Sequence, residues 1–233
     1  MKLEARKEQI LDFIVRHYVN TATPISSEVV CKKSKINIST ATARNIMLEL
    51  DQNGFLTQPH TSAGRIPTEK GYRYFIKNLS EMRIPAKSAR QEVAHATSRL
   101  DDDIEIAFHE LSHVLAHNLK LFSGVGILQN DRRIFSYGMA DVFREPEFKE
   151  HALTVQFANF VEHLEDELDH MFENSDIPQI NIGTFGMVSA VFRNKHIGDC
   201  MLFSIGPQRM DYEAARSLLK YTADDIISQT IST

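Results

Sequence analysis

Side chains that can pair with DNA bases are gathered in the segment Ser39-Thr-Ala-Thr-Ala-Arg-Asn45. An arginine can bond to both acceptors of a guanine edge, an asparagine can do the same with adenine, and hydroxyl groups suit phosphates. The alternative is that these polar side chains merely solvate the exposed face of a helix. The residues predicted to contact DNA from this segment are Ser39, Thr40, Thr42, Arg44 and Asn45.

A second group of donors follows in an extended segment, Gly54-Phe-Leu-Thr-Gln-Pro-His-Thr-Ser-Ala-Gly-Arg-Ile-Pro-Thr68. Its two prolines and two glycines disfavour a helix and favour a tight, exposed hairpin. No acidic residue occurs from Thr57 to Thr68, whereas ordinary surface loops usually contain one. We expect Arg65 to enter a minor groove or to pair with a phosphate. The residues predicted to contact DNA from this hairpin are His60, Thr61, Ser62, Gly64 and Arg65.

Three helices joined by short turns must position these two groups. Apolar residues recur with the period of a helix over 4–18, and serines at the right places predict the starts of helices over 26–33 and 39–53. Three helices followed by a hairpin over 57–68 are the arrangement of a winged helix-turn-helix, in which the second helix of the pair enters the major groove. The sequence therefore predicts a DNA-binding domain over 1–78.

Charge is distributed unevenly along the chain. The first 80 residues hold 12 lysines and arginines against 7 aspartates and glutamates, which gives a net charge of +5. The whole chain has a net charge of −5, so the remainder carries −10. A basic first third joined to an acidic remainder suggests one part that faces nucleic acid and another that does something else.

Ile84-Pro85 breaks the helical pattern and predicts a boundary, so that residues 79–233 form a second domain. This domain combines helical segments over 86–119 and 146–172 with alternating apolar stretches typical of strands, one of them over 133–142. The expected fold class of the chain is α+β. The two helical segments are also the candidate surfaces through which two copies of the chain pair.

The segment His109-Glu-Leu-Ser-His113 matches the H-E-x-x-H pattern, in which two histidines bind zinc and the glutamate serves as a base. A zinc hydrolase that uses residues 109–113 is therefore one alternative. The extended protease pattern, however, needs a glycine at position 116 and a histidine at 119, where this chain has Ala116 and Leu119. We expect no enzyme, no metal and no cofactor, and interpret the segment as a histidine-rich helix near a dimer interface.

Cysteine usage and apolar patterning indicate a location inside the cell. Cys31 and Cys200 lie far apart without a pairing motif, which is typical of reduced thiols. No apolar run approaches the roughly 18 residues of a membrane-spanning helix. The charged, amphipathic start of the sequence lacks the apolar segment of a secretory signal. We expect a cytoplasmic protein with no membrane partner.

Three motifs resemble one family closely. The segments Ser39–Asn45 and Gly54–Thr68, together with Gly71-Tyr-Arg-Tyr-Phe75, are similar to the N-terminal domain of the bacterial heat-inducible transcription repressor HrcA family. Near the C-terminus, Gly206-Pro-Gln-Arg-Met-Asp-Tyr212 and Leu219-Lys-Tyr-Thr-Ala223 resemble the end of that family's GAF-like domain. The long hairpin match is the most specific of these motifs.

The resemblance implies a dimeric repressor that binds double-stranded DNA at an inverted-repeat operator upstream of GroE- and DnaK-type chaperone operons. It also implies that heat reduces the active form and that the GroE chaperonin helps to restore it. The chain resembles a shortened member, because its GAF-like domain is about a hundred residues smaller than the family's, and Ile46 replaces an expected acidic residue. A ligand-sensing winged-helix regulator of another pathway is the main alternative.

Overall fold

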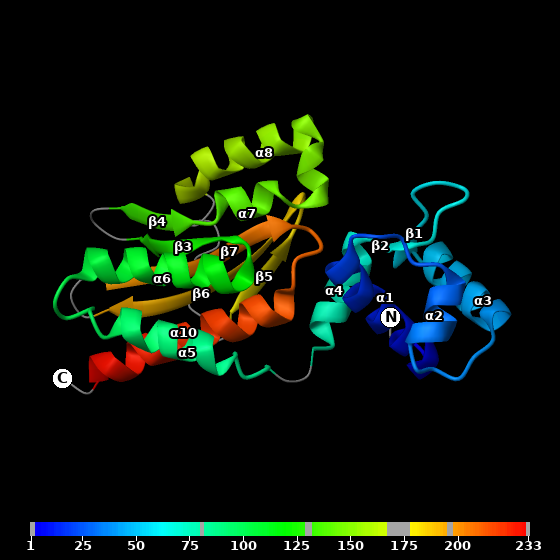
Figure 1. Cartoon of the computed structure of the whole chain (residues 1–233), viewed down its shortest axis with the longest axis horizontal. Helices are drawn as coiled ribbons and strands as arrows, with labels where there is room; N and C mark the ends of the chain where they lie inside the picture. The colour runs from blue at the N-terminus through cyan, green and yellow to red at the C-terminus, as the bar shows by residue number, and fades with distance from the viewer. Residues whose placement is uncertain (1–2, 80–81, 129–131, 167–177, 195–197, 232–233) are drawn as a thin grey trace. The chain divides into compact units, whose positions relative to one another are not determined.

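The computed structural model describes residues 3–79, 82–128, 132–166, 178–194 and 198–231 (Figure 1). Nothing is described for the side chains of Asn194, Thr230 and Ile231. The chain divides into two compact units, which we call unit 1 (Met1–Ser80) and unit 2 (Glu81–Thr233). Each unit is described by itself.

Unit 1 consists of four helices and a small hairpin. In chain order these are α1 (Ala5–Thr21), α2 (Ser27–Lys33), α3 (Thr40–Gln52), β1 (Leu56–Thr57), β2 (Ile66–Pro67) and α4 (Glu69–Lys77). The strands are antiparallel, with Leu56 opposite Pro67 and Thr57 opposite Ile66. The apolar stripes of the helices meet in one core, whose most deeply buried side chains include Ile10, Ile14, Val30, Met47, Leu50 and Tyr72.

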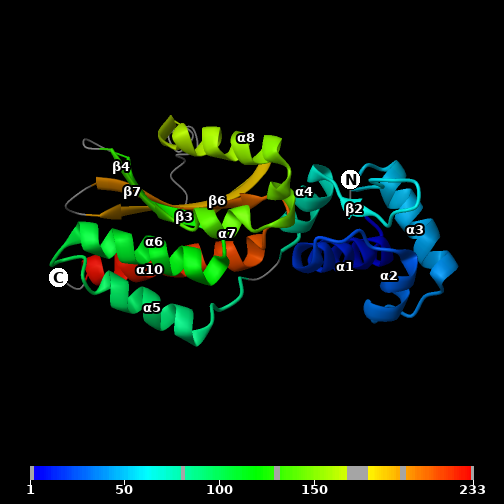
Figure 2. The same cartoon turned by 45° about the horizontal axis from the view of Figure 1, so that its top comes forward.

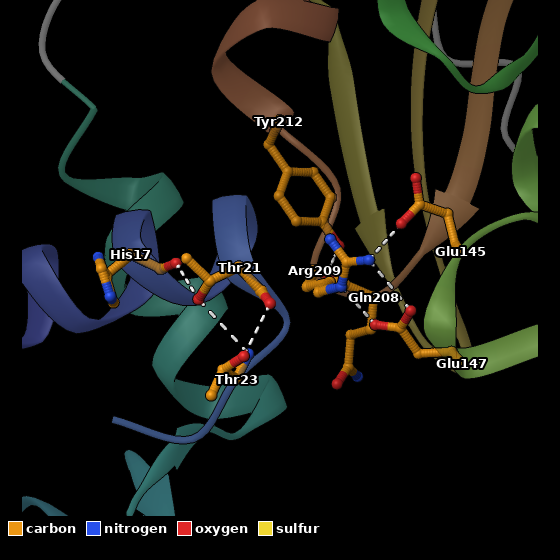
Figure 3. Close-up of polar contacts among 8 residues, drawn as sticks. All are labelled: His17, Thr21, Thr23, Glu145, Glu147, Gln208, Arg209 and Tyr212. Atoms are coloured by element: carbon orange, nitrogen blue, oxygen red, sulfur yellow. Dashed lines mark hydrogen bonds and ion pairs between the residues drawn. The ribbon is translucent and has the colours of Figure 1, made fainter. Parts of the chain in front are cut away.

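Hydroxyl side chains fix the ends of the helices in unit 1. Ser26, Ser39 and Thr68 accept a hydrogen bond from a backbone N–H in the first turn of α2, α3 and α4, respectively. Such caps satisfy donors that have no partner within the helix. At the end of α1, the Thr21 hydroxyl donates to the His17 carbonyl at 2.8 Å (Figure 3). Hydroxyl caps in the sequence therefore specify where α2, α3 and α4 begin.

Unit 2 is built on a five-stranded, entirely antiparallel sheet in the order β4-β3-β7-β6-β5. The α+β fold class predicted from the sequence is confirmed for this part of the chain. The strands, in chain order, are β3 (Phe122–Ile127), β4 (Arg133–Tyr137), β5 (Gln179–Ile182), β6 (Phe185–Asn194) and β7 (Gly198–Pro207).

Helices cover both faces of this sheet (Figure 2). On one face, α6 (Ile104–Leu119) and α10 (Tyr212–Ile231) pack directly on the strands, and α5 (Lys87–Thr97) packs on both of these helices. On the other face lie α7 (Met139–Phe143), the 3₁₀ turn η1 (Pro146–Lys149) and α8 (His151–Glu162). In its described residues, unit 2 is therefore a layered structure with apolar side chains buried on both faces of the sheet.

The core beneath α8 is strongly aromatic. Phe157 is fully buried there, and its ring centroid lies 4.9 Å from Phe185, 5.3 Å from Phe148 and 6.1 Å from Phe122. The interplanar angles of these three pairs lie between 82° and 86°, the edge-to-face geometry that aromatic rings favour. Phe157 thus joins α8 to both η1 and the sheet.

An ion-pair cluster fastens η1 to the turn between β7 and α10. The largely buried Arg209 guanidinium donates from Nε to Glu147 at 2.5 Å, and its Nη2 also bonds to Glu145 (Figure 3). Burial alone would lower the pKa of Arg209, but the hydrogen bonds and charges of Glu147 and Glu145 raise it above its ordinary value. The cluster keeps the arginine charged where a lone buried cation would be costly.

The helical segments differ from their predicted extents. Residues 86–119 form two helices, because Asp103 accepts backbone hydrogen bonds from the first turn of α6 and starts a new helix there. Within 146–172, a 3₁₀ turn precedes α8, which ends at Glu162, and residues 167–172 lie outside the described part. The strand predicted over 133–142 ends at Tyr137, since Gly138 turns the chain at φ 98° and α7 begins.

The two cysteines are free thiols, as expected from the sequence. Burial raises the pKa of Cys200 to about 12, and the neighbouring Asp199 carboxylate acts in the same direction. Among the described residues, none of the helices is long and apolar enough to cross a membrane.

Candidate nucleic-acid interface

Helix α3 has one buried face and one exposed face. The buried face consists of Ala43, Met47 and Leu50. The exposed residues of α3 are Ala41, Arg44, Asn45, Leu48, Glu49 and Gln52, and we call the first four of them the exposed stripe. The 3.6-residue period places these four positions within about 100° of one another around the helix axis. The stripe therefore presents a guanidinium and an amide together, flanked by small and apolar groups.

Two hydroxyl groups at the start of α3, those of Ser39 and Thr42, take part in hydrogen bonds within the helix N-terminus. Ser39 Oγ accepts from the Thr42 backbone N–H at 3.1 Å and lies 2.9 Å from Thr42 Oγ1. Ser39 is exposed, whereas Thr40 and Thr42 are half-buried. All three lie at the helix N-terminus, where the partial positive charge of the helix dipole suits an anion. Ser39, Thr40 and Thr42 therefore lie at the N-terminal end of α3, and the exposed stripe begins next to them.

Both acidic residues on α3 are paired with a basic residue. Glu49 Oε2 lies 2.8 Å from the ammonium of Lys7 on α1. This hydrogen bond, together with the charge of Glu4, raises the pKa of Lys7. Asp51 Oδ2 accepts from Arg65 Nε at 2.8 Å. The carboxylates of α3 are thus directed toward neighbouring cations of unit 1.

The tip of the hairpin is exposed and internally ordered. His60, Thr61 and Ser62 are all exposed. The Gln58 side-chain amide donates to the carbonyls of Thr61 at 3.0 Å and Ala63 at 2.8 Å, which bridges the loop from within. These bonds hold the donor groups of the tip in one arrangement, although the loop has no strand pairing of its own.

Gly64 and Arg65 lie at the base of the hairpin and not at its tip. Arg65 exchanges two backbone hydrogen bonds with Ile25, of 2.9 and 2.8 Å, in the turn before α2. A Cβ atom added at Gly64 would lie 2.4 Å from the backbone carbon and oxygen of Ile25. The Arg65 side chain is only 15% exposed and is bound to Asp51. The structure therefore gives Arg65 a part in fastening the hairpin to α3 that the sequence prediction did not contain.

Two residues that shape this surface were missed in the sequence prediction. Asp51 was counted only as part of the helix, and its partner Arg65 lies 14 positions away. Gln58 was treated as one residue of an extended segment. Its position just before a Pro-His-Thr-Ser turn is a usable signal, since a side-chain amide next to a loop can satisfy the loop's carbonyls. No comparable local signal identifies Asp51.

His109 and His113 lie on one face of α6, and their rings pack on aromatic side chains. The His109 ring lies 4.9 Å from the Phe135 ring, and the His113 ring lies 5.5 Å from the Tyr137 ring. Glu110 pairs with Arg99 at 2.9 Å. Within the described residues, no group of three or more His, Cys, Asp or Glu side chains could hold a metal ion. The geometry therefore gives the zinc alternative no third ligand in that part of the chain.

Fold and surface together define a class of protein: a two-unit α+β chain whose basic first unit presents an arginine and an asparagine on an exposed helix face beside an exposed hairpin tip. The family model described as "HrcA protein C terminal domain" matches residues 76–215, which is more than half of the chain. The chain belongs to the HrcA family, and the resemblance found in the sequence is confirmed.

Curated relatives carry the name heat-inducible transcription repressor HrcA. A protein of this name from Chloroflexus aurantiacus is 39% identical over 120 residues, which cover 50% of this chain and 32% of the relative. Another from Geobacter sulfurreducens is 34% identical over 146 residues, covering 63% of this chain and 40% of the relative. The chain thus spans less than half the length of the curated relatives it matches, which fits the expected shortened member.

One solved structure has a similar fold over the whole chain. It is the crystal structure of a hypothetical protein, with a TM-score of 0.82, 17% sequence identity and 99% coverage of both chains. At this identity the likeness concerns the fold alone.

Proposed function

We propose that this protein is a DNA-binding transcription repressor of heat-shock operons that encode GroE- and DnaK-type chaperones. In this proposal unit 1 is a winged helix-turn-helix in which α3 enters the major groove and the hairpin is the wing. The contacts to DNA come from the start of α3, from the exposed stripe and from the hairpin tip. Such a repressor acts on chromosomal DNA in the cytoplasm and is no enzyme.

The observation that carries the proposal is the exposed stripe on α3, next to a hairpin tip that holds His60, Thr61 and Ser62 outward. Arg44 and Asn45 supply the two side chains best suited to guanine and adenine edges. Each carboxylate of α3 is paired with a cation of unit 1, which offsets part of its repulsion of a phosphate backbone, although the Glu49 side chain is 48% exposed. The names of the relatives support the same class of function.

Unit 2, whose sheet and helices are consistent with a GAF-like domain, would pair two chains as a homodimer on an inverted repeat. Two half-sites are needed because one small winged domain binds a specific sequence weakly. Candidate pairing surfaces are α5 with α6, and α8. Release on heating would follow from loss of a marginally stable dimer or fold. The GroE chaperonin is the proposed partner that restores the active form.

The proposal is tested by titrating an inverted repeat from a chaperone promoter with wild-type protein and the variant Arg44→Ala. We expect the variant to lose roughly 10- to 100-fold in affinity and to tolerate base changes that wild type rejects, since a bidentate arginine contact is worth about 1–3 kcal/mol. Its melting temperature should stay unchanged, because Arg44 is exposed. Fluorescence anisotropy at several salt concentrations measures the affinity.

A matched control is Arg144→Ala, which removes a similarly exposed arginine from unit 2, where it pairs with Asp141. This variant should bind the operator like wild type. Wild-type affinity and base preference in Arg44→Ala would contradict the assignment of α3 as the recognition helix. A small molecule that changed operator affinity would favour the ligand-sensing alternative.

Two variants distinguish whether Arg65 fastens the hairpin to α3 or contacts a phosphate of the DNA. If Arg65 fastens the hairpin, Arg65→Ala and Asp51→Asn should both weaken operator binding and both lower the stability of unit 1. We expect a loss of about 1–2 kcal/mol, because a charged hydrogen bond contributes about 1.5–3 kcal/mol and solvent at the partly exposed Asp51 weakens it. If Arg65 contacts a phosphate directly, Arg65→Ala should reduce the salt dependence by about one unit, while Asp51→Asn binds normally. We expect the first pattern, because the guanidinium is largely buried against Asp51.

A further inference from the structure

Leu48 is an exposed apolar side chain on the same helix face as Arg44 and Asn45. It is 45% exposed, and in the described part of unit 1 (residues 3–79) it is the sole large hydrophobic side chain with such exposure. It lies on the exposed stripe, one helical turn after Arg44, and points away from the core that Met47 enters. A partner that covers the exposed part of Leu48 would remove apolar surface from water and so gain affinity.

We propose that Leu48 is a specificity-determining residue that packs against the 5-methyl group of a thymine in the major groove. The inference rests on the proposed function and extends it to one kind of base. Among the groups on base edges in the major groove, the thymine methyl is the apolar one, whereas the others donate or accept hydrogen bonds. Leu48 shares its stripe with Arg44 and Asn45, whose chemistry fits bases and not an apolar protein surface.

Helix geometry limits where that thymine lies. Leu48 follows Arg44 by four residues, which corresponds to about 6 Å along the helix axis. Base pairs are spaced about 3.4 Å apart, so the thymine lies within about two base pairs of the guanine that Arg44 recognises. The small Ala41 at the other end of the stripe allows the helix to approach the bases closely. The proposal therefore predicts both the kind of base and its neighbourhood.

The test replaces thymine by uracil, which removes the methyl group and keeps the hydrogen-bonding edge. The duplex is the tightest-binding inverted repeat selected from a randomised pool with the full chain, and each thymine of one half-site is replaced in turn. For wild type we expect one position at which uracil weakens binding about fourfold, the worth of one buried methyl group. Leu48→Ala should bind the thymine duplex more weakly and lose the difference between thymine and uracil at that position.

Two further variants serve as controls for this experiment. Leu48→Met keeps an apolar side chain of similar volume and should retain the preference for thymine. Ile227→Ala removes an aliphatic side chain of similar exposure, 39%, from α10 and should leave the preference intact. Circular dichroism melting checks that each variant is folded, which we expect because both positions are exposed.

The other outcomes would overturn the proposal. If Leu48→Ala keeps the same thymine-to-uracil ratio as wild type at every position, Leu48 does not read a methyl group. If Leu48→Ala instead weakens self-association in sedimentation velocity while DNA affinity per dimer is unchanged, Leu48 is covered by protein. If the selection enriches no duplex at all, the proposed function fails together with this inference.

Discussion

Replacing Phe157 by alanine is expected to destabilise unit 2 by about 3–5 kcal/mol, the usual cost of deleting a buried phenylalanine. Phe157 is fully buried, and its ring touches aromatic residues from α7, η1 and the sheet. The remaining rings are too large and too constrained to fill the space that it leaves. For a unit of this size, such a loss lowers the melting temperature by about 10 °C.

This variant also tests the proposed mechanism of heat release. If the operator is released when unit 2 or its dimer loses structure, the release temperature should fall by about as much as the melting temperature of unit 2. Differential scanning calorimetry gives the melting temperature of unit 2. Fluorescence anisotropy of a labelled operator, recorded during heating, gives the release temperature. The matched control Phe143→Ala removes a phenylalanine that is 38% exposed, and its effect should be much smaller. A lowered melting point with an unchanged release temperature would show that release is governed elsewhere.

Gly64→Ala is expected to reduce operator affinity on the order of 100-fold, because a methyl group forced into packed backbone costs up to about 3 kcal/mol. The added Cβ would meet the backbone carbon and oxygen of Ile25 at 2.4 Å and its nitrogen at 2.7 Å. Backbone atoms cannot move aside as a flexible side chain does. We therefore expect the base of the hairpin to move away from Ile25 in the turn before α2. This movement would also disturb the hydrogen bond between Arg65 and Asp51.

A glycine elsewhere provides the control for Gly64→Ala. At Gly183, between β5 and β6, an added Cβ meets nothing within 4 Å. Gly183→Ala should therefore bind the operator and melt like wild type. Within the hairpin itself, Ser62→Ala changes the exposed tip without a clash and should weaken binding by only a few fold. Equal affinities for Gly64→Ala and wild type would mean that the docked hairpin is not needed for binding.

The sequence was most informative where local chemistry decides the structure. Serine caps and helical periodicity predict the first three helices of unit 1 to within a few residues. It was less informative in unit 2. There the helical spacing of apolar residues predicts one segment over 86–119, whereas the structure has two helices, α5 and α6. That break depends on a carboxylate cap at Asp103, which the apolar period alone does not reveal.

The candidate interface was predictable in composition but not in geometry. Residue types alone identified Arg44, Asn45 and the donors of the hairpin tip, and the structure leaves these side chains exposed. The partnership of Arg65 with Asp51 was not predictable, because it joins the hairpin base to the end of α3 through tertiary packing. The exposure of Leu48 was not predictable for a related reason. An apolar residue in a helix is ordinarily assigned to a core, and its exposure becomes evident only when the buried face is known.

The ion-pair cluster around Arg209 has a consequence for a protein whose relatives are named for their response to heat. The hydration of charged groups becomes less favourable as temperature rises, so the cost of holding Arg209, Glu145 and Glu147 away from water falls on heating. The stabilisation supplied by apolar contacts, by contrast, levels off at high temperature. The corner where η1 meets the turn before α10 is therefore relatively stronger in a hot cell, and we expect thermal loosening of unit 2 to begin away from it.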